Sequence, residues 1–217
     1  CSDYLETPPS VDYGENEVFA TRADAEKLLT TLYAEGMPYG FCMSSSNTDR
    51  RLLSSSTLAS ACDEGEDVAT WAMGNAAWNA GNHTNTNFPW DEDCRFYLRN
   101  HTMRVANLIL KRIHEVPFDE GDPDFNKRTT GEAYFMRAML LWEGVYRYGG
   151  MPIVREVIDP TDFSQRPRNS FSDCIDSILI DCDRATQYLP DYYTDNAKLG
   201  RATRIAALAL KARVLLY

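Results

Sequence analysis

The sequence predicts an all-α protein, built from tetratricopeptide-like helical hairpins in a right-handed superhelix with long irregular loops. The segment from Gly131 to Val154 has apolar residues on two neighbouring faces, at alternating steps of four and three. A helix of this kind must be covered on two sides. In addition, the expected helix starts fall into two pairs, one near residues 97 and 130 and one near residues 171 and 203. Within each pair the two starts are separated by roughly one tetratricopeptide period of ~34 residues.

The chain is expected to begin with a lead segment, residues 1–20, that lacks a sustained period and acts as an extended spacer. The helical domain is expected to cover residues 21–217. Its first helix begins after Thr21, whose hydroxyl can accept from a free amide, and ends at Gly36. The predicted buried face of this helix consists of Ala25, Leu28, Leu29 and Leu32.

Residues 39–89 alternate serine runs and an acidic cluster with short apolar pieces, so that at most brief helices fit there. Loops of this length are usually either disordered or functional. Helical periodicity resumes near Phe96 and continues to Glu115, and Pro117 ends the helix. The acidic stretch 119–126 is expected to be a linker.

The central helix has recognisable end signals. Thr129 and Glu132 have the spacing of a capping box, which predicts a helix start at this point. Gly149 and Gly150 follow the last turn, and Pro152 lies just beyond them, which predicts the end.

Two further helices are predicted. The first ends before Pro190 and carries Asp173, Asp176, Asp181 and Asp183 mostly away from an apolar seam of Phe171, Ile175, Ile178, Cys182, Ala185 and Leu189. The second begins near Thr203 and has no cap at its end, which leaves apolar side chains there without a covering element. We therefore expect the sequence to be the N-terminal part of a longer molecule.

Three segments point to a family. They are Glu132 to Ile153, with Arg137 and Tyr148-Gly149-Gly150; Gly200-Arg201-Ala202-Thr203, which opens an Ala-rich helix; and the start Cys1-Ser2-Asp3-Tyr4-Leu5. Together they resemble the corresponding segments of the SusD-like (SusD/RagB) surface lipoproteins of Bacteroidetes.

The resemblance implies a tetratricopeptide-like scaffold, and a lipid on Cys1 that anchors the protein to the outer membrane at the cell surface. Stable retention then requires several acyl chains, since each buried methylene contributes only ~0.8 kcal/mol. The resemblance also implies a SusC-like TonB-dependent transporter as the partner, and a nutrient such as an oligosaccharide as the ligand. On the residues alone, a Cys at the first position would usually be an accident of where the sequence starts.

Composition excludes some classes of protein. The net charge of -10 argues against nucleic acid, because phosphate binding needs a basic surface. No apolar run approaches the ~18 residues of a membrane span. The sequence shows no charged-then-apolar pattern of a signal peptide, and if there was a signal, it has been removed. Cys174 and Cys182 are expected on one helix about 12 Å apart, too far for a disulfide. A disulfide among Cys42, Cys62 and Cys94 is possible, but buried free thiols are the expected state.

No catalytic or cofactor motif stands out, so we expect a protein that is not an enzyme and binds no cofactor. The histidines fit no HExxH pattern, there is no CxxC pair, and no pair among the 32 acidic residues is singled out by spacing. Asp122, Asp124 and Asn126 begin like a calcium-binding loop, but Lys127 stands where glycine is needed. We interpret this stretch as a solvated turn and expect no metal site.

The candidate binding site lies in the irregular region. Trp71, Asn75, Trp78 and Asn79 would share one face of a helix, and Asn82 follows closely. An indole can pack on the C–H face of a sugar, and a carboxamide supplies both a donor and an acceptor for sugar hydroxyls. The residues alone favour a different interpretation, in which Trp71 and Trp78 anchor a long loop to the core. SusD-like proteins bind glycans with loops in this part of the chain, and this resemblance favours glycan binding.

Three functions therefore remain open. The first is a cell-surface glycan-binding lipoprotein that works with a TonB-dependent transporter in nutrient uptake. The second is a helical-repeat scaffold for protein interactions that binds no glycan. The third, for which the residues offer least support, is an all-helical enzyme that cleaves glycans.

Overall fold

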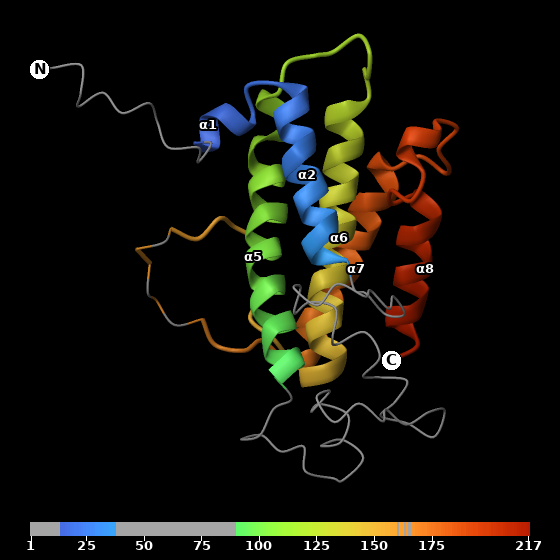
Figure 1. Cartoon of the computed structure of the whole chain (residues 1–217). Coiled ribbons are helices and arrows are strands. Elements are labelled where there is room, and N and C mark those ends of the chain that lie inside the picture. Colours follow the sequence, from blue (N-terminus) through green and yellow to red (C-terminus); the bar gives the residue numbers. More distant parts are fainter. Residues whose placement is uncertain (1–13, 38–89, 160, 163, 165) are drawn as a thin grey trace, which may run out of the picture. The chain divides into compact units, whose positions relative to one another are not determined.

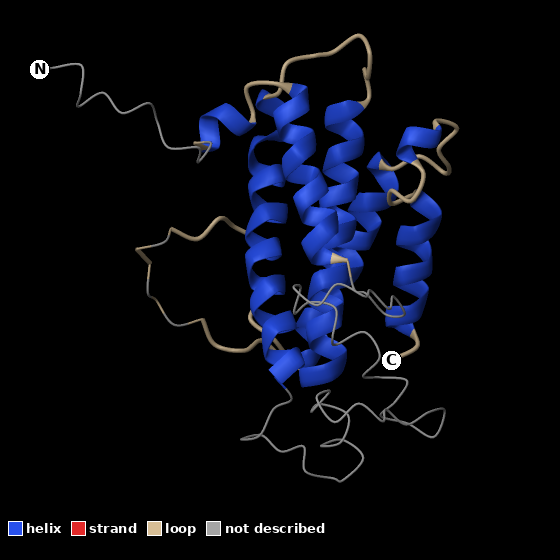
Figure 2. Cartoon of the chain, in the orientation of Figure 1, coloured by secondary structure: helices blue, strands red, loops and turns tan. Residues whose placement is uncertain are grey.

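The computed structural model describes residues 14–37, 90–159, 161, 162, 164 and 166–217. These residues form helices and loops, and none of them lies in a strand (Figure 2). The predicted all-α class is therefore confirmed. The chain divides into two compact units, one of residues 1–34 with 103–217 and one of residues 35–102. The boundary expected at residue 20 stays a prediction.

The first unit contains most of the described helices (Figure 1). α6 packs against α7, and α7 packs against α8. α5 and α6 form one sequential pair, and α7 and α8 form another, as in tetratricopeptide hairpins. In chain order the α-helices are α1 (Glu15–Val18), α2 (Arg22–Gly36), α5 (Trp90–Arg112), α6 (Phe125–Tyr148), α7 (Phe171–Tyr188) and α8 (Arg204–Leu215), with 3₁₀ turns at Ile113–Glu115 and Asn196–Lys198.

Hydroxyl caps fix three of the helix starts. The side-chain oxygens of Thr21, Ser170 and Thr203 accept from the amides of Asp24, Asp173 and Ala206 at 3.2, 3.0 and 3.1 Å. Each bond satisfies an amide that has no partner inside its helix. The predicted starts after Thr21 and near Thr203 are confirmed.

The predicted start of the central helix is wrong. α6 begins at Phe125, one turn before the expected position, and Phe125 is buried. Thr129 therefore lies inside the helix, where its buried hydroxyl has no hydrogen-bond partner in the described part of the chain. The Glu132 carboxylate accepts from Arg128 and Arg201 instead of forming a capping box.

The predicted end of the same helix is confirmed. Gly149 adopts φ 74°, and its amide donates to Val145 O at 2.9 Å. This left-handed conformation is easily reached by glycine and costs other residues strain.

α6 is buried on more than one face, as its apolar pattern predicted. Its buried apolar residues include Ala133, Phe135, Met136, Ala138, Leu140, Leu141, Trp142 and Val145.

α7 follows its predicted seam through Ile178, Cys182 and Ala185, which are buried, whereas Phe171 is exposed. Cys174 and Cys182 are buried free thiols, as expected from their spacing, and burial raises the pKa of Cys182 to about 12. Cys42, Cys62 and Cys94 lie outside the residues whose side chains are described.

Three further features complete the fold. α5 starts at Trp90, earlier than the expected Phe96. In the second unit His101 Nε2 lies 3.7 Å from the Glu35 carboxylate. In the first unit Leu215, Leu216 and Tyr217 at the end of α8 are exposed, as the sequence predicted, and Ile205 and Leu208 within α8 are exposed as well.

Candidate functional site

The site residues predicted from the sequence lie outside the described part of the chain. This holds for Trp71, Asn75, Trp78, Asn79 and Asn82, and for Cys1. Their roles stay predictions.

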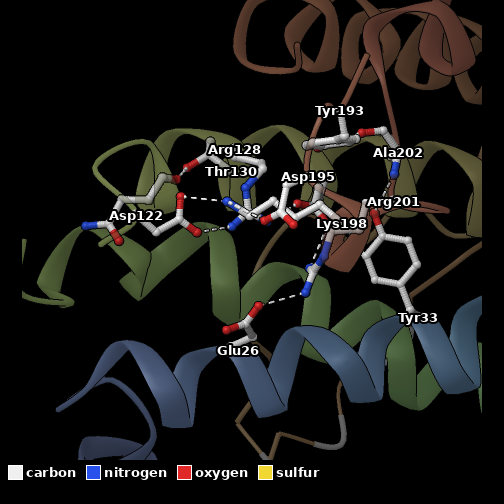
Figure 3. A network of polar contacts seen from close by, with 12 residues as sticks. Glu26, Tyr33, Asp122, Arg128, Thr130, Tyr193, Asp195, Lys198, Arg201 and Ala202 are labelled. Carbon is white, nitrogen blue, oxygen red and sulfur yellow. Dashed lines mark hydrogen bonds and ion pairs between the residues drawn. The ribbon is translucent and has the colours of Figure 1, made fainter. Parts of the chain in front are cut away.

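In the first unit, polar residues from α2, α6 and the segment after α7 form a partly buried network (Figure 3). Its centre is Glu132, whose side chain is fully buried on α6. One carboxylate oxygen accepts from Arg128 at 2.8 Å, and the other accepts from Arg201 at 3.3 Å. Arg201 also donates to Glu26 of α2 at 2.8 Å. The ion pairs offset part of the cost of burying these charges.

Asp122 extends this network at the start of α6. Its carboxylate accepts from Arg128 at 2.6 Å and lies 3.1 Å from Lys198 Nζ and 3.5 Å from Arg22. Burial raises the pKa of Asp122, but the hydrogen bond from Lys198 and the charge of Arg128 outweigh burial and lower it below the ordinary value. The carboxylate is therefore held in its charged form.

Two tyrosines hold the backbone that enters α8. The Tyr33 hydroxyl accepts from the Ala202 amide at 2.9 Å, and the Tyr193 hydroxyl donates to Ala202 O at 3.0 Å. Burial, followed by the nearby Glu132 charge, raises the pKa of both tyrosines above the ordinary value. Both hydroxyls therefore stay protonated at neutral pH.

A cavity of about 280 Å³ opens beside this network. Tyr192 at its edge is 71% exposed, whereas Asp122 and Arg128 in its wall are buried. An exposed aromatic ring next to fixed charges and hydroxyls suits a small ligand that has both an apolar face and hydroxyl groups. The cavity is lined by Asp122, Asp124, Lys127, Arg128, Gln187, Tyr188, Leu189, Pro190, Tyr192, Tyr193, Thr194, Asp195 and Lys198.

The sequence analysis did not identify this cavity. The available signal was the pair Tyr192-Tyr193, which lies between Pro190 and the acidic turn at Asp195.

In the described part of the chain, no group of three or more His, Cys, Asp or Glu side chains is arranged so that it could hold a metal ion. In the segment that begins like a calcium loop, Asp122 pairs with cationic side chains. Asn126 uses its carboxamide to donate to Val116 O at 2.9 Å. Within the same described residues, no helix combines the length and apolarity needed to cross a membrane.

Comparisons with known proteins define the class. Residues 3–216 match the model of a SusD-like family, described as starch-binding and associating with the outer membrane. The chain therefore belongs to the SusD-like family, and the resemblance inferred from its sequence is confirmed. No match was found among proteins with curated annotation.

Solved structures give the same fold. A SusD-like protein from Bacteroides fragilis is 26% identical, with a TM-score of 0.69 over 93% of this chain and 36% of its own. A laminarin-binding SusD-like protein is 22% identical, with a TM-score of 0.69 over 92% of this chain and 41% of its own. A surface glycan-binding protein from Bacteroides fluxus is 16% identical, with a TM-score of 0.60 over 91% of this chain and 40% of its own. The chain thus spans less than half the length of these relatives.

Proposed function

We propose that the protein binds oligosaccharides at the cell surface, without catalysis, and passes them to a TonB-dependent transporter of the outer membrane. The observation that carries the proposal is the cavity of the first unit, where the exposed Tyr192 ring lies beside a rigid set of charged and hydroxyl groups. The family description and the glycan ligands named for two related structures support this function. Each sugar contact contributes little energy, so the ligand is an oligosaccharide that makes several contacts.

Two groups of residues are candidates for sugar binding. The first is the segment predicted from the sequence, with Trp71 and Trp78 as stacking groups and Asn75, Asn79 and Asn82 as hydrogen-bonding groups. The second is the cavity at Tyr192. We treat them as separate sites, each tested by its own variant.

The test is calorimetric binding of maltoheptaose and laminarihexaose, followed by a glycan array, on the full-length protein. If the tryptophan segment is the main site, Trp71→Ala with Trp78→Ala abolishes binding, whereas if the cavity is the main site, Tyr192→Ala abolishes it. Phe118→Ala is the control, because Phe118 is an equally exposed aromatic residue outside the cavity. A protein that binds no glycan on the array contradicts the proposed function, and binding that survives both variants contradicts both sites.

The cellular part of the proposal rests on Cys1 and on the family. Lipid attachment at Cys1 anchors the protein to the outer membrane, and a SusC-like transporter is the partner. Cys1→Ala should release the protein from the membrane fraction and abolish metabolic labelling with a fatty acid. Retention of label in this variant contradicts lipidation at Cys1.

A second candidate function, a scaffold for protein interactions, is favoured by α8, where Leu208 and Ile205 are exposed on a helix of the described unit. Exposed apolar side chains in such a group are typical of a surface that contacts protein. A partner that co-purifies stably with the protein, together with an empty glycan array, would favour this function over sugar binding.

A further inference from the structure

The first unit has a second cavity, of about 450 Å³, whose wall carries more cationic side chains than that of the cavity at Tyr192. It lies among α5, α6, α7 and the segment that follows α6. Its wall includes Lys111, Arg137, Arg155 and Arg184, with Glu156 as the acidic residue. Four cations in one cavity are notable in a chain whose net charge is -10.

The charge of Arg137 is compensated. Its guanidinium donates to both carboxylate oxygens of Asp181, at 2.7 and 2.8 Å, and to the Asn107 side chain at 2.9 Å. Both Arg137 and Asp181 are buried. This bidentate pair forms a fixed, neutral base for the cavity.

The other three cations are poorly compensated. Arg155 donates to the backbone and side-chain oxygens of Ser177, at 2.9 and 2.7 Å, and lies 3.5 Å from Asp181, which Arg137 already occupies. Lys111 and Arg184 form no ion pair with any carboxylate in the described part of the chain. Glu156 is largely exposed and lies 3.8 Å from Arg166.

The environment of Arg155 indicates the same excess of positive charge. Burial lowers its pKa below the ordinary value, and the charges of Arg137 and Arg184 lower it further, against the opposite effect of Asp181. A bound anion would relieve this repulsion.

Tyr134 explains why charge rather than stacking would hold a ligand here. The guanidinium carbons of Arg137 and Arg184 lie 5.4 and 5.5 Å from the centre of its ring, and the Tyr188 ring lies 6.1 Å away. These cation–π contacts orient the guanidinium groups and leave the ring already engaged.

We propose that this cavity binds the carboxylate or sulfate group of an acidic saccharide, through Arg184, Lys111 and Arg155. Planar guanidinium groups offer paired N–H donors that match the oxygens of such groups, and an ammonium adds a point charge. The saccharide part of this proposal rests on the glycan-binding function proposed above. The anion part depends only on the cavity.

The test compares four probes by calorimetry on the full-length protein at low salt: digalacturonate, its uncharged dimethyl ester, inorganic sulfate and hexaglutamate. We expect digalacturonate to bind at least about tenfold more tightly than the ester, since hydrogen bonds to charged groups contribute roughly 1.5–3 kcal/mol. Binding should weaken as salt rises from 50 to about 300 mM, because these cations are partly exposed. Equal binding of acid and ester overturns the proposal.

The matched variants are Arg184→Gln with Lys111→Gln, against Arg213→Gln as control. All three side chains are exposed, and Arg213 lies on α8, away from the cavity lining. The double variant should lose about tenfold or more of the affinity for digalacturonate, whereas the control should retain it. Unchanged affinity in the double variant overturns the site.

The remaining outcomes separate this proposal from the proposed function. Sulfate or hexaglutamate that binds as tightly as digalacturonate overturns the saccharide assignment and identifies a general anion site or a site for an acidic protein segment. Neutral oligosaccharides are measured on the unmutated protein and on the same variants, and we expect the variants to bind them normally. If the unmutated protein binds them while it does not bind digalacturonate, the acidic-sugar proposal fails and glycan binding stands.

Discussion

Arg137 shows how one side chain can join three parts of a helical unit. Its guanidinium connects α6 to Asp181 of α7 and to Asn107 of α5. The Asn107 carboxamide in turn donates to the backbone oxygens of Val154 and Glu156, at 3.1 and 3.0 Å. The side chains therefore fix both the helix packing and the path of the chain that leaves α6.

Replacing Asp181 by Asn should be strongly destabilising, because it leaves the buried Arg137 guanidinium without a counter-charge. The expected loss is about 3–5 kcal/mol of unfolding free energy, measured by urea denaturation. Asp183→Asn is the control, since Asp183 is exposed and pairs with Lys211 at the surface; we expect a loss of under about 1 kcal/mol. Equal losses in the two variants would contradict the role given to the buried pair.

This pair could not be predicted from the sequence. The periodicity of α7 places its aspartates mostly away from the apolar seam, and Asp183 follows that pattern, whereas Asp181 is buried. The difference is made by Arg137, which lies 44 residues earlier in the chain. A pattern within one helix gives no information about a partner at that distance.

At the scale of elements, the exit from α6 is built by close approach of two backbones. A Cβ on Gly150 would lie 2.0 Å from Asn169 O, so only glycine fits there. The Asn169 amide donates to Met151 O at 3.1 Å, and Arg168 donates to Gly150 O at 2.6 Å and to Tyr148 O. These bonds satisfy backbone oxygens at the helix end and place a cation there, which the helix dipole favours.

Gly150→Ala should therefore destabilise the protein by at least about 1–3 kcal/mol, the usual cost of overpacking, because the obstacle is backbone rather than a movable side chain. Gly144→Ala is the matched control. There the added methyl would meet only the flexible Met151 side chain at 3.3 Å, and alanine favours a helix by roughly 0.5–1 kcal/mol over glycine. Thermal unfolding of both variants is the measurement, and a Gly150→Ala variant as stable as Gly144→Ala would contradict this packing.

The helix ends were predicted from the sequence where a local residue determines them, as Gly149, Pro190 and Thr203 do. The start of α6 was predicted wrongly. The first turn of this helix, which precedes the predicted start, is stabilised by burial of Phe125 and by ion pairs of Arg128 with Asp122 and Glu132. A capping-box spacing at Thr129 cannot compete with those contacts. The cavity at Tyr192 was not predicted for a related reason. Its wall combines the start of α6 with the segment after α7, which are far apart in the sequence.

At the scale of the whole molecule, the stability of this acidic chain should depend on pH through Asp122. The pKa of Asp122 is lowered in the folded state, so the unfolded state binds the proton more readily. The stabilisation is therefore complete above the unfolded pKa of about 3.9 and is lost as pH falls through the folded value.

We expect the urea midpoint of the natural protein to fall as pH decreases below about 4. Asp122→Asn should be less stable than the natural protein at pH 7, because Arg128 and Lys198 lose a charged partner. On acidification the variant should lose less stability than the natural protein. Asp124→Asn, at an exposed position two residues further on, is the control. If the urea midpoint of Asp122→Asn falls on acidification as much as that of the natural protein, Asp122 is not the source of the pH dependence.

The guanidinium of Arg201 has a consequence for synthesis on the ribosome. It touches Glu26 and Glu132, and the first of these lies 175 residues earlier in the chain. While translation proceeds, α2 and α6 emerge before their common cation exists, so the fully buried Glu132 carboxylate has Arg128 of its own helix as a partner before it has Arg201. The contact that joins α2 to α6 through a shared guanidinium can thus form only after residue 201 has left the exit tunnel.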